Sequence, residues 1–334
     1  MNNISLTQKK LGVIKKMFFA VIVFLIFFGS LEGIQRIRHP HVGFRGMTNS
    51  KGFRSLEFST EKKAGVFRIL FIGSSTTFSI TGPVEKTFPY LTGELLKEKI
   101  PGMRIETINA SWPAKTSYWE VKRLKETLSL DPDLVIIMTG YNDAASIFAR
   151  FAKIGERGDL VMTSWPVKLE TFLAQYSVLY VTLKEKISIW VHGRPDFAFG
   201  KARLDLANEN MKNGQWLENY PKHFRANVEK MLQLLRSRQI PAVFMEGPLS
   251  DNRRNRVPLY AKAYLRLTEE LEQFCQEQNI PLLDLSLFFP SNEQGILISQ
   301  DGLHFNAEGN LRIAEALSSF LIDHNQVKKN SPAV

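Results

Sequence analysis

The sequence predicts an α/β fold: a three-layer α/β/α sandwich with a mainly parallel, flavodoxin-like sheet, preceded by one N-terminal transmembrane helix. Short apolar runs and amphipathic helical patterns alternate from Val66 onward, which is typical of parallel strands joined by helices. The apolar runs have few polar positions, as expected of strands that are buried on both faces. A charge-free apolar run at residues 17–31 precedes this pattern.

The N-terminal segment is predicted to anchor the chain in a membrane. Residues 1–16 contain four lysines and no acidic residue, and the uncharged run that follows is nearly all apolar. This pattern fits either a secretory signal or a signal-anchor helix. The absence of a clear small-residue cleavage site favours an uncleaved anchor at residues 17–34. Because positive flanks stay inside, we expect a single-pass protein of the cell membrane whose catalytic domain is extracytoplasmic, either periplasmic or extracellular.

The alternating region supplies five strands and five helices in order. The expected strands are residues 68–72, 104–109, 134–139, 242–246 and 281–285. The expected helices are residues 89–99, 118–128, 224–239, 259–278 and 307–322. The last helix carries an apolar stripe at helical spacing, so one of its faces should pack on the sheet.

Residues 145–220 interrupt this alternation, because a strand–helix connection usually has only 2 to 6 residues. The segment is rich in aromatic residues and begins just after a strand end. Two interpretations remain open: a lid that shapes the substrate site, and a helical excursion that packs for stability.

Residues that could take part in catalysis follow several of the expected strands, beginning with the first. Ser74, Ser75, Thr76 and Thr77 follow the first strand directly after Gly73. In open α/β sheets, ligands and catalytic groups lie outside the carboxyl ends of the strands. A serine at such a turn can serve as a nucleophile, although hydroxyl clusters also cap helices.

Two further segments complete a hydrolytic site. Asn142 follows the strand that ends near Gly140, and Asp301 precedes His304 by three residues near the C-terminus. An asparagine side chain can stabilise an oxyanion, and an aspartate can orient a histidine that takes the serine proton. The three segments therefore supply a nucleophile, an oxyanion donor and an oriented base.

These residues resemble the SGNH (GDSL-like) hydrolase family, membrane-anchored type, in an ordered set of blocks. The matching stretches are residues 73–77, 109–117, 140–143 and 301–304, and the likeness runs from about residue 48 to 320. The resemblance implies the SGNH hydrolase fold, with Ser75 as nucleophile, His304 as base and Asp301 as its orienting partner. It also implies an oxyanion hole built from the Ser75 amide, the Ala114 amide and the Asn142 side chain.

Two positions depart from the pattern of the family. The aspartate that usually precedes the nucleophile is Ser74 here, and that aspartate takes part in no chemical step. The glycine whose amide helps to form the oxyanion hole is Ala114. An alanine amide can donate equally well unless the turn requires a positive φ, where alanine is disfavoured.

The resemblance implies a membrane-anchored serine esterase that cleaves an ester or acyl bond through an acyl-enzyme, as an esterase, a lipase or a carbohydrate deacetylase does. Its substrate would be an acyl ester, either a lipid or an acylated glycan. The alternatives are an O-acyltransferase of cell-envelope glycans that uses the same triad, and a non-catalytic envelope-binding module. The serine mechanism needs no cofactor and no metal.

Composition narrows the classes of partner. The net charge is +10, and +6 remains without the four N-terminal lysines. The other basic residues are spread along the chain and are not interleaved with aromatic residues, so a basic surface near a membrane is favoured over nucleic-acid binding. The single cysteine, Cys275, excludes an internal disulfide framework. The oligomeric state and the natural substrate stay open.

The expected organisation has five parts in sequence. They are a basic cytoplasmic N-terminus (1–16), a transmembrane signal-anchor (17–34), a juxtamembrane segment (35–65), the SGNH hydrolase domain (66–325) with its insertion at 145–220, and a tail (326–334).

Overall fold

The computed structural model of the chain describes residues 2–38, 47–148, 215–299 and 301–327, residue 212, and individual residues between 169 and 190. The chain divides into two units, each of which is described here by itself. One comprises Met1–Met47 and Trp165–Asp196. The other comprises Thr48–Ser164 and Phe197–Val334, and it contains the sheet.

The sheet has five parallel strands in the order β2-β1-β3-β4-β5. Their bounds are β1 Val66–Gly73, β2 Arg104–Asn109, β3 Leu134–Met138, β4 Ala242–Glu246 and β5 Leu282–Asp284. All five residues of β3 are buried, as a central strand covered on both faces requires. This order is that of the flavodoxin-like doubly wound sheet, so the fold prediction is confirmed.

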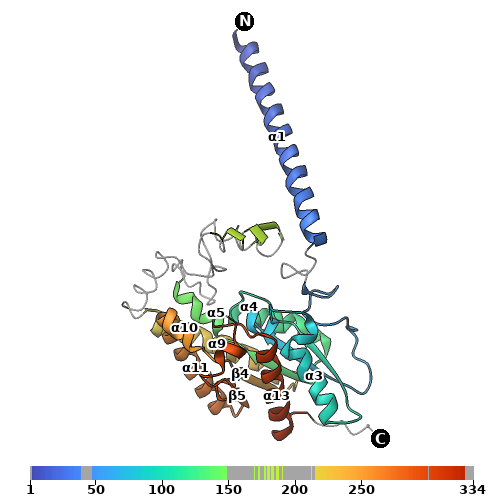
Figure 1. The fold of residues 1–334 in the computed structure, drawn as a ribbon, viewed down its shortest axis with the longest axis vertical. Helices are drawn as coiled ribbons and strands as arrows, with labels where there is room; N and C mark the ends of the chain where they lie inside the picture. The colour runs from blue at the N-terminus through green and yellow to red at the C-terminus, as the bar shows by residue number, and fades with distance from the viewer. Residues whose placement is uncertain are drawn as a thin grey trace. The chain divides into compact units, whose positions relative to one another are not determined.

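Five long helices cover the sheet (Figure 1). They are α3 (Phe88–Lys99), α4 (Ser117–Thr127), α9 (Gln215–Arg236), α11 (Pro258–Gln278) and α13 (Ala307–Asp323). Helix α3 packs against α13, whereas α9 packs against both α4 and α11. Right-handed crossovers place the first pair on one face of the sheet and the other three on the opposite face.

Short helices fill the connections and the strand ends. They are α2 (Ser75–Phe78), η2 (Val84–Lys86), η3 (Leu128–Leu130), α5 (Tyr141–Ala144), η4 (Ala145–Phe148), α10 (Asp251–Arg256), η5 (Leu285–Phe288) and α12 (Gln294–Leu297). Four of the five long helices begin within one residue of their expected start. Helix α9 begins nine residues before the expected 224, and its additional turns bury Trp216 and Tyr220 in the core.

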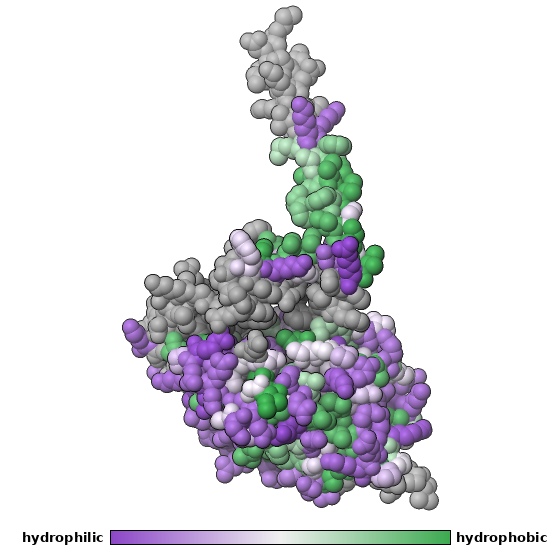
Figure 2. Space-filling view, in the orientation of Figure 1, coloured by the Kyte–Doolittle hydropathy of each residue, from purple (hydrophilic) through white to green (hydrophobic). Residues whose placement is uncertain are grey.

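The N-terminal unit contains α1, a continuous helix over Asn2–Arg38. Its stretch Lys15–Gln35, 21 residues long with a mean hydropathy of 2.3, is the one candidate membrane span among the described residues. At 1.5 Å per residue this stretch is about 30 Å long, which matches the hydrocarbon core of a bilayer. Between its polar ends, the surface of this stretch is mostly apolar (green in Figure 2).

The expected insertion at residues 145–220 falls mostly outside the described residues. Those that are described between 169 and 190 belong to the unit that contains α1. A lid role for the insertion stays a prediction.

Candidate active site

The turn after β1 exposes one hydroxyl group of the four in its sequence. Ser74, Thr76 and Thr77 are each at most 2% exposed, whereas Ser75 is half-buried at the first position of α2. Gly73 permits this close turn, because a Cβ there would lie 2.2 Å from Thr77 Oγ1 and 2.7 Å from the Met138 carbonyl oxygen. Ser75 is therefore the most accessible of the four hydroxyl residues at this turn.

Ser75, His304 and Asp301 form one hydrogen-bonded chain. His304 Nε2 lies 2.8 Å from Ser75 Oγ, although the two residues are 229 positions apart in the sequence. His304 Nδ1 forms a short hydrogen bond with Asp301 Oδ2. The other carboxylate oxygen, Asp301 Oδ1, accepts hydrogen bonds from the backbone amides of Leu303 at 2.9 Å and His304 at 3.0 Å. The carboxylate is thus fixed by its own turn before it orients the imidazole.

The environment of Asp301 keeps its carboxyl group ionised. Burial raises the pKa of Asp301. The hydrogen bond and charge of His304 and the two backbone amides together outweigh this effect, so that the pKa falls from 3.8 to about 2. An ionised Asp301 can only accept hydrogen bonds, which leaves the proton on His304 Nδ1 and the lone pair on Nε2. Nε2 then faces Ser75 Oγ as a proton acceptor.

Asn142 and Ala114 are brought together at neighbouring turns. Asn142 lies on α5, and its Nδ2 donates a hydrogen bond of 3.0 Å to the carbonyl oxygen of Lys115. The residue before that carbonyl is Ala114, which is exposed and has φ of +57°. The turn therefore requires the left-handed conformation that favours glycine, and alanine adopts it at a cost of about 1 kcal/mol. No backbone hydrogen bond engages the Ala114 amide in the described part of the chain.

A buried polar network centred on Asp143 lies beneath these turns. The Asp143 carboxylate accepts hydrogen bonds from the Ser117 amide (2.9 Å), the Ser117 hydroxyl (2.6 Å) and the Tyr220 hydroxyl (3.3 Å). Asn227 Nδ2 donates to Ser117 Oγ at 3.0 Å. Asp143 therefore connects two segments through its hydrogen bonds. One is the turn that carries Asn142, and the other is the start of α4, three residues after Ala114.

A second buried carboxyl group, that of Glu120, interacts electrostatically with Asp143. Burial raises the pKa of Asp143 to about 6, despite the hydrogen bonds of Ser117 that lower it. Burial and the charge of Asp143 raise the pKa of Glu120 well above its usual value. Because like charges in the interior repel, an ionised Asp143 disfavours ionisation of Glu120.

Arg54 holds the chain just after the nucleophile turn. It is 4% exposed and donates hydrogen bonds to the carbonyl oxygens of Phe78 (3.3 Å), Ser79 (3.2 Å) and Gly82 (2.7 Å). Its guanidinium carbon lies 5.4 Å from the centre of the Phe78 ring. The sequence signal for this contact is the lead-in segment at residues 48–58, which the resemblance includes without assigning a role to Arg54.

Within the described residues, no group of three or more His, Cys, Asp or Glu side chains is placed to hold a metal ion. The polar groups that converge here are a hydroxyl, an imidazole and a carboxylate.

The sequence model of the GDSL-like lipase/acylhydrolase family matches residues 71–312. The chain belongs to this family. The matched range includes every residue of the hydrogen-bonded chain and both turns that hold Ala114 and Asn142. The prediction of a GDSL-type esterase is therefore confirmed at the level of the family.

Solved structures of GDSL-type and related hydrolases are similar to this chain. A lipase/acylhydrolase from Enterococcus faecalis is 18% identical, with 79% of this chain and 99% of that chain covered and a TM-score of 0.46. A catalytic mutant of an acetylxylan esterase from Geobacillus stearothermophilus is 15% identical, with 76% and 94% covered and a TM-score of 0.47. The esterase EstA from Pseudoalteromonas is 16% identical, with 78% and 99% covered and a TM-score of 0.44. No curated protein matches the sequence.

Proposed function

We propose that this GDSL-family protein is a membrane-anchored serine hydrolase that cleaves an ester bond of an acyl lipid or an acylated glycan. The observation that carries the proposal is the hydrogen-bonded chain from Ser75 Oγ through His304 to Asp301. A serine hydroxyl is a weak nucleophile near neutral pH, and a general base at hydrogen-bond distance activates it. The 2.8 Å contact with His304 Nε2 meets this requirement.

The proposed reaction proceeds in two halves. Ser75 Oγ attacks the acyl carbon while its proton passes to His304 Nε2. The carbon–oxygen bond to the leaving group then breaks, and that oxygen takes the proton from Nε2. In the second half, water attacks the acyl carbon of acyl-Ser75 while its proton passes to His304 Nε2. The bond from the acyl carbon to Ser75 Oγ then breaks, Oγ takes the proton back from Nε2, and the acid is released. Asp301 stays ionised throughout and stabilises the imidazolium.

The proposed oxyanion hole consists of the Ser75 amide, the Ala114 amide and the Asn142 side chain. The exposed position of Ala114 and the absence of a backbone partner for its amide among the described residues support this role. The Asn142–Lys115 hydrogen bond fixes the side-chain amide beside that turn. Preorganised donors of this kind are worth about 3 to 4 kcal/mol each in the transition state.

Labelling with a fluorophosphonate tests the nucleophile. The probe should modify Ser75 and no other serine in the folded full-length chain, because Ser74 is buried beside it. Peptide mapping by mass spectrometry identifies the modified residue. Ser75→Ala should remove the label and Ser74→Ala should keep it. Modification of Ser74, or no reaction in folded protein, would show that this turn does not carry the nucleophile.

We further propose that α1 anchors the chain in the cell membrane, with residues 1–16 in the cytoplasm and the hydrolase domain (66–325) outside it. The exposed apolar stretch Lys15–Gln35 and the lysine-rich, acid-free segment before it support this topology. Protease added to intact spheroplasts should digest the domain, and the membrane fraction should retain residue 1. Protection of the domain would reverse the orientation, and a mature N-terminus near residue 30 would indicate a cleaved signal.

A further inference from the structure

A second apolar surface lies in the same unit as the anchor. Among residues 165–196, five described side chains are large, apolar and exposed: Leu169, Phe172, Leu183, Ile187 and Trp190. Trp190 is 86% exposed, the highest value among the exposed apolar residues of the described chain. A tryptophan so exposed usually indicates a binding surface, because burying it gains free energy over a large area.

Three of these side chains have the sequence spacing of one helix face. The described residues 179–180, 182–183, 186–187 and 190 are helical. Leu183, Ile187 and Trp190 are spaced by four and then three residues, which places them on the same side of a helix. Lys186, also exposed, lies at the flank of this face. An exposed apolar helix face with a basic flank is typical of helices that lie in the plane of a membrane interface.

Glu32, near the outer end of the proposed membrane span, accepts hydrogen bonds from the start of this helical segment. Its carboxylate oxygen Oε2 accepts hydrogen bonds from Ser177 Oγ (2.8 Å) and from the Leu179 amide (3.0 Å). Ser177 Oγ also accepts from the Tyr180 amide at 3.0 Å, as the N-cap of a helix does. The start of the helical segment is therefore hydrogen-bonded to Glu32, which lies three residues before the span ends at Gln35.

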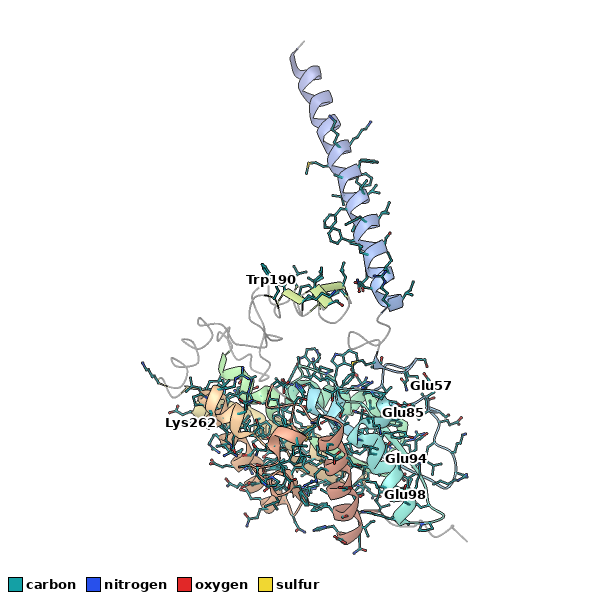
Figure 3. The ribbon with its side chains drawn as sticks, viewed as in Figure 1. Glu57, Glu85, Glu94, Glu98, Trp190 and Lys262 are labelled. Atoms are coloured by element: carbon teal, nitrogen blue, oxygen red, sulfur yellow. The ribbon has the colours of Figure 1, made fainter. Side chains whose placement is uncertain are left out.

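The exposure of α1 changes at the same place. Residues 15–30 are exposed along the whole stretch, whereas Leu31, Glu32, Gly33 and Gln35 are half-buried. The segment thus packs on α1 only where the apolar run ends. If Lys15–Gln35 spans the bilayer, this height is the boundary between acyl chains and headgroups. Trp190 lies at the end of the segment away from α1 (Figure 3).

We propose that the face formed by Leu183, Ile187 and Trp190 inserts into the outer surface of the membrane that α1 spans. This inference rests on the proposed anchoring by α1. The lipid surface is the occupant that the geometry favours, because the start of the segment that carries this face is hydrogen-bonded to Glu32 near the end of the span. Tryptophan is enriched at that depth, where its ring meets the headgroups, and the lysine flank suits anionic lipids. The surface would hold the hydrolase close to acyl substrates that are themselves in the membrane.

Photocrosslinking of the full-length chain tests the proposal. The photoreactive residue p-benzoylphenylalanine replaces Trp190, Phe24 or Leu287 in three separate variants, each reconstituted in vesicles of phosphatidylcholine with a minority of anionic phosphatidylglycerol. Phe24, 58% exposed on α1, reports on the anchor, and Leu287 is a matched apolar control, 78% exposed in the other unit. Because all three positions are exposed, the substitutions should leave the fold intact, which circular dichroism checks.

The expected result is about tenfold more lipid adduct at position 190 than at position 287. Lipid adducts at 24 but only protein adducts, or none, at 190 would overturn the proposal and leave the anchor in place. Adducts at 190 without adducts at 24 would overturn the anchor, and with it the proposal as stated. Lipid adducts at neither position would overturn both.

Discussion

Replacing His304 by alanine should lower the turnover of an activated ester by about 10⁴-fold or more, because the serine hydroxyl loses its general base. The 2.8 Å contact between His304 Nε2 and Ser75 Oγ is the interaction that the variant removes. Asp301→Ala should cost less, since a water molecule can partly orient the ring. The double variant should be little worse than His304→Ala alone, because residues that act as one unit lose activity non-additively. Steady-state kinetics of the three variants measure these losses.

The reference for this series is Ser75→Ala, which removes the nucleophile and should be as inactive as His304→Ala. Thermal unfolding of each variant checks that the fold is kept. Additive losses in the double variant would mean that His304 and Asp301 perform separate tasks. Sensitivity of the native protein to a chelator would contradict the serine mechanism itself.

Asn142→Ala should lower kcat by about 10²- to 10³-fold with little change in KM, because a donor to the developing oxyanion is lost. Such a donor acts mainly in the transition state, so substrate binding is affected less than turnover. The side chain also donates to the Lys115 carbonyl, and its loss removes one restraint from the turn of Ala114. Kinetics on a soluble activated ester separate the two parameters.

The matched control is Asn292→Ala, which makes the same chemical change at an exposed turn outside the site. It should leave both kcat and KM at the native values. Native turnover in Asn142→Ala would remove Asn142 from the proposed oxyanion hole. An equal rise in KM and fall in kcat/KM, with kcat unchanged, would assign it to substrate binding instead.

The sequence was sufficient to predict the strands and helices that are marked by patterns of neighbouring residues. The apolar runs of β1, β3 and β4 predict buried parallel strands because each run records burial on both faces. The start of α13 at Ala307 follows from Asn306, whose side chain accepts a hydrogen bond from the Gly309 amide as an N-cap. The predicted start of α9 was wrong by nine residues. Trp216 and Tyr220 extend the helix because they are buried in the core, and this tertiary packing leaves no local sequence pattern.

The residue types of the candidate site were also present in the sequence, in the order that the GDSL family uses. The sequence did not show how these residues come together in one site. Ser75 and His304 meet across 229 positions only because parallel strands bring their carboxyl ends to the same edge of the sheet. The single accessible hydroxyl among Ser74, Ser75, Thr76 and Thr77 is likewise a result of burial.

By itself, therefore, the sequence determined the fold class, the family and the chemical identity of the proposed nucleophile, base and orienting carboxylate. The tertiary structure alone decided the positive φ of Ala114, the clamp of Arg54 on the Phe78–Gly82 carbonyls, and the buried Asp143–Ser117 contact. The physical reason is the range of the interactions. Burial patterns, caps and motifs are recorded within a few neighbouring residues, whereas backbone strain and buried polar contacts depend on which distant segments the folded chain brings together.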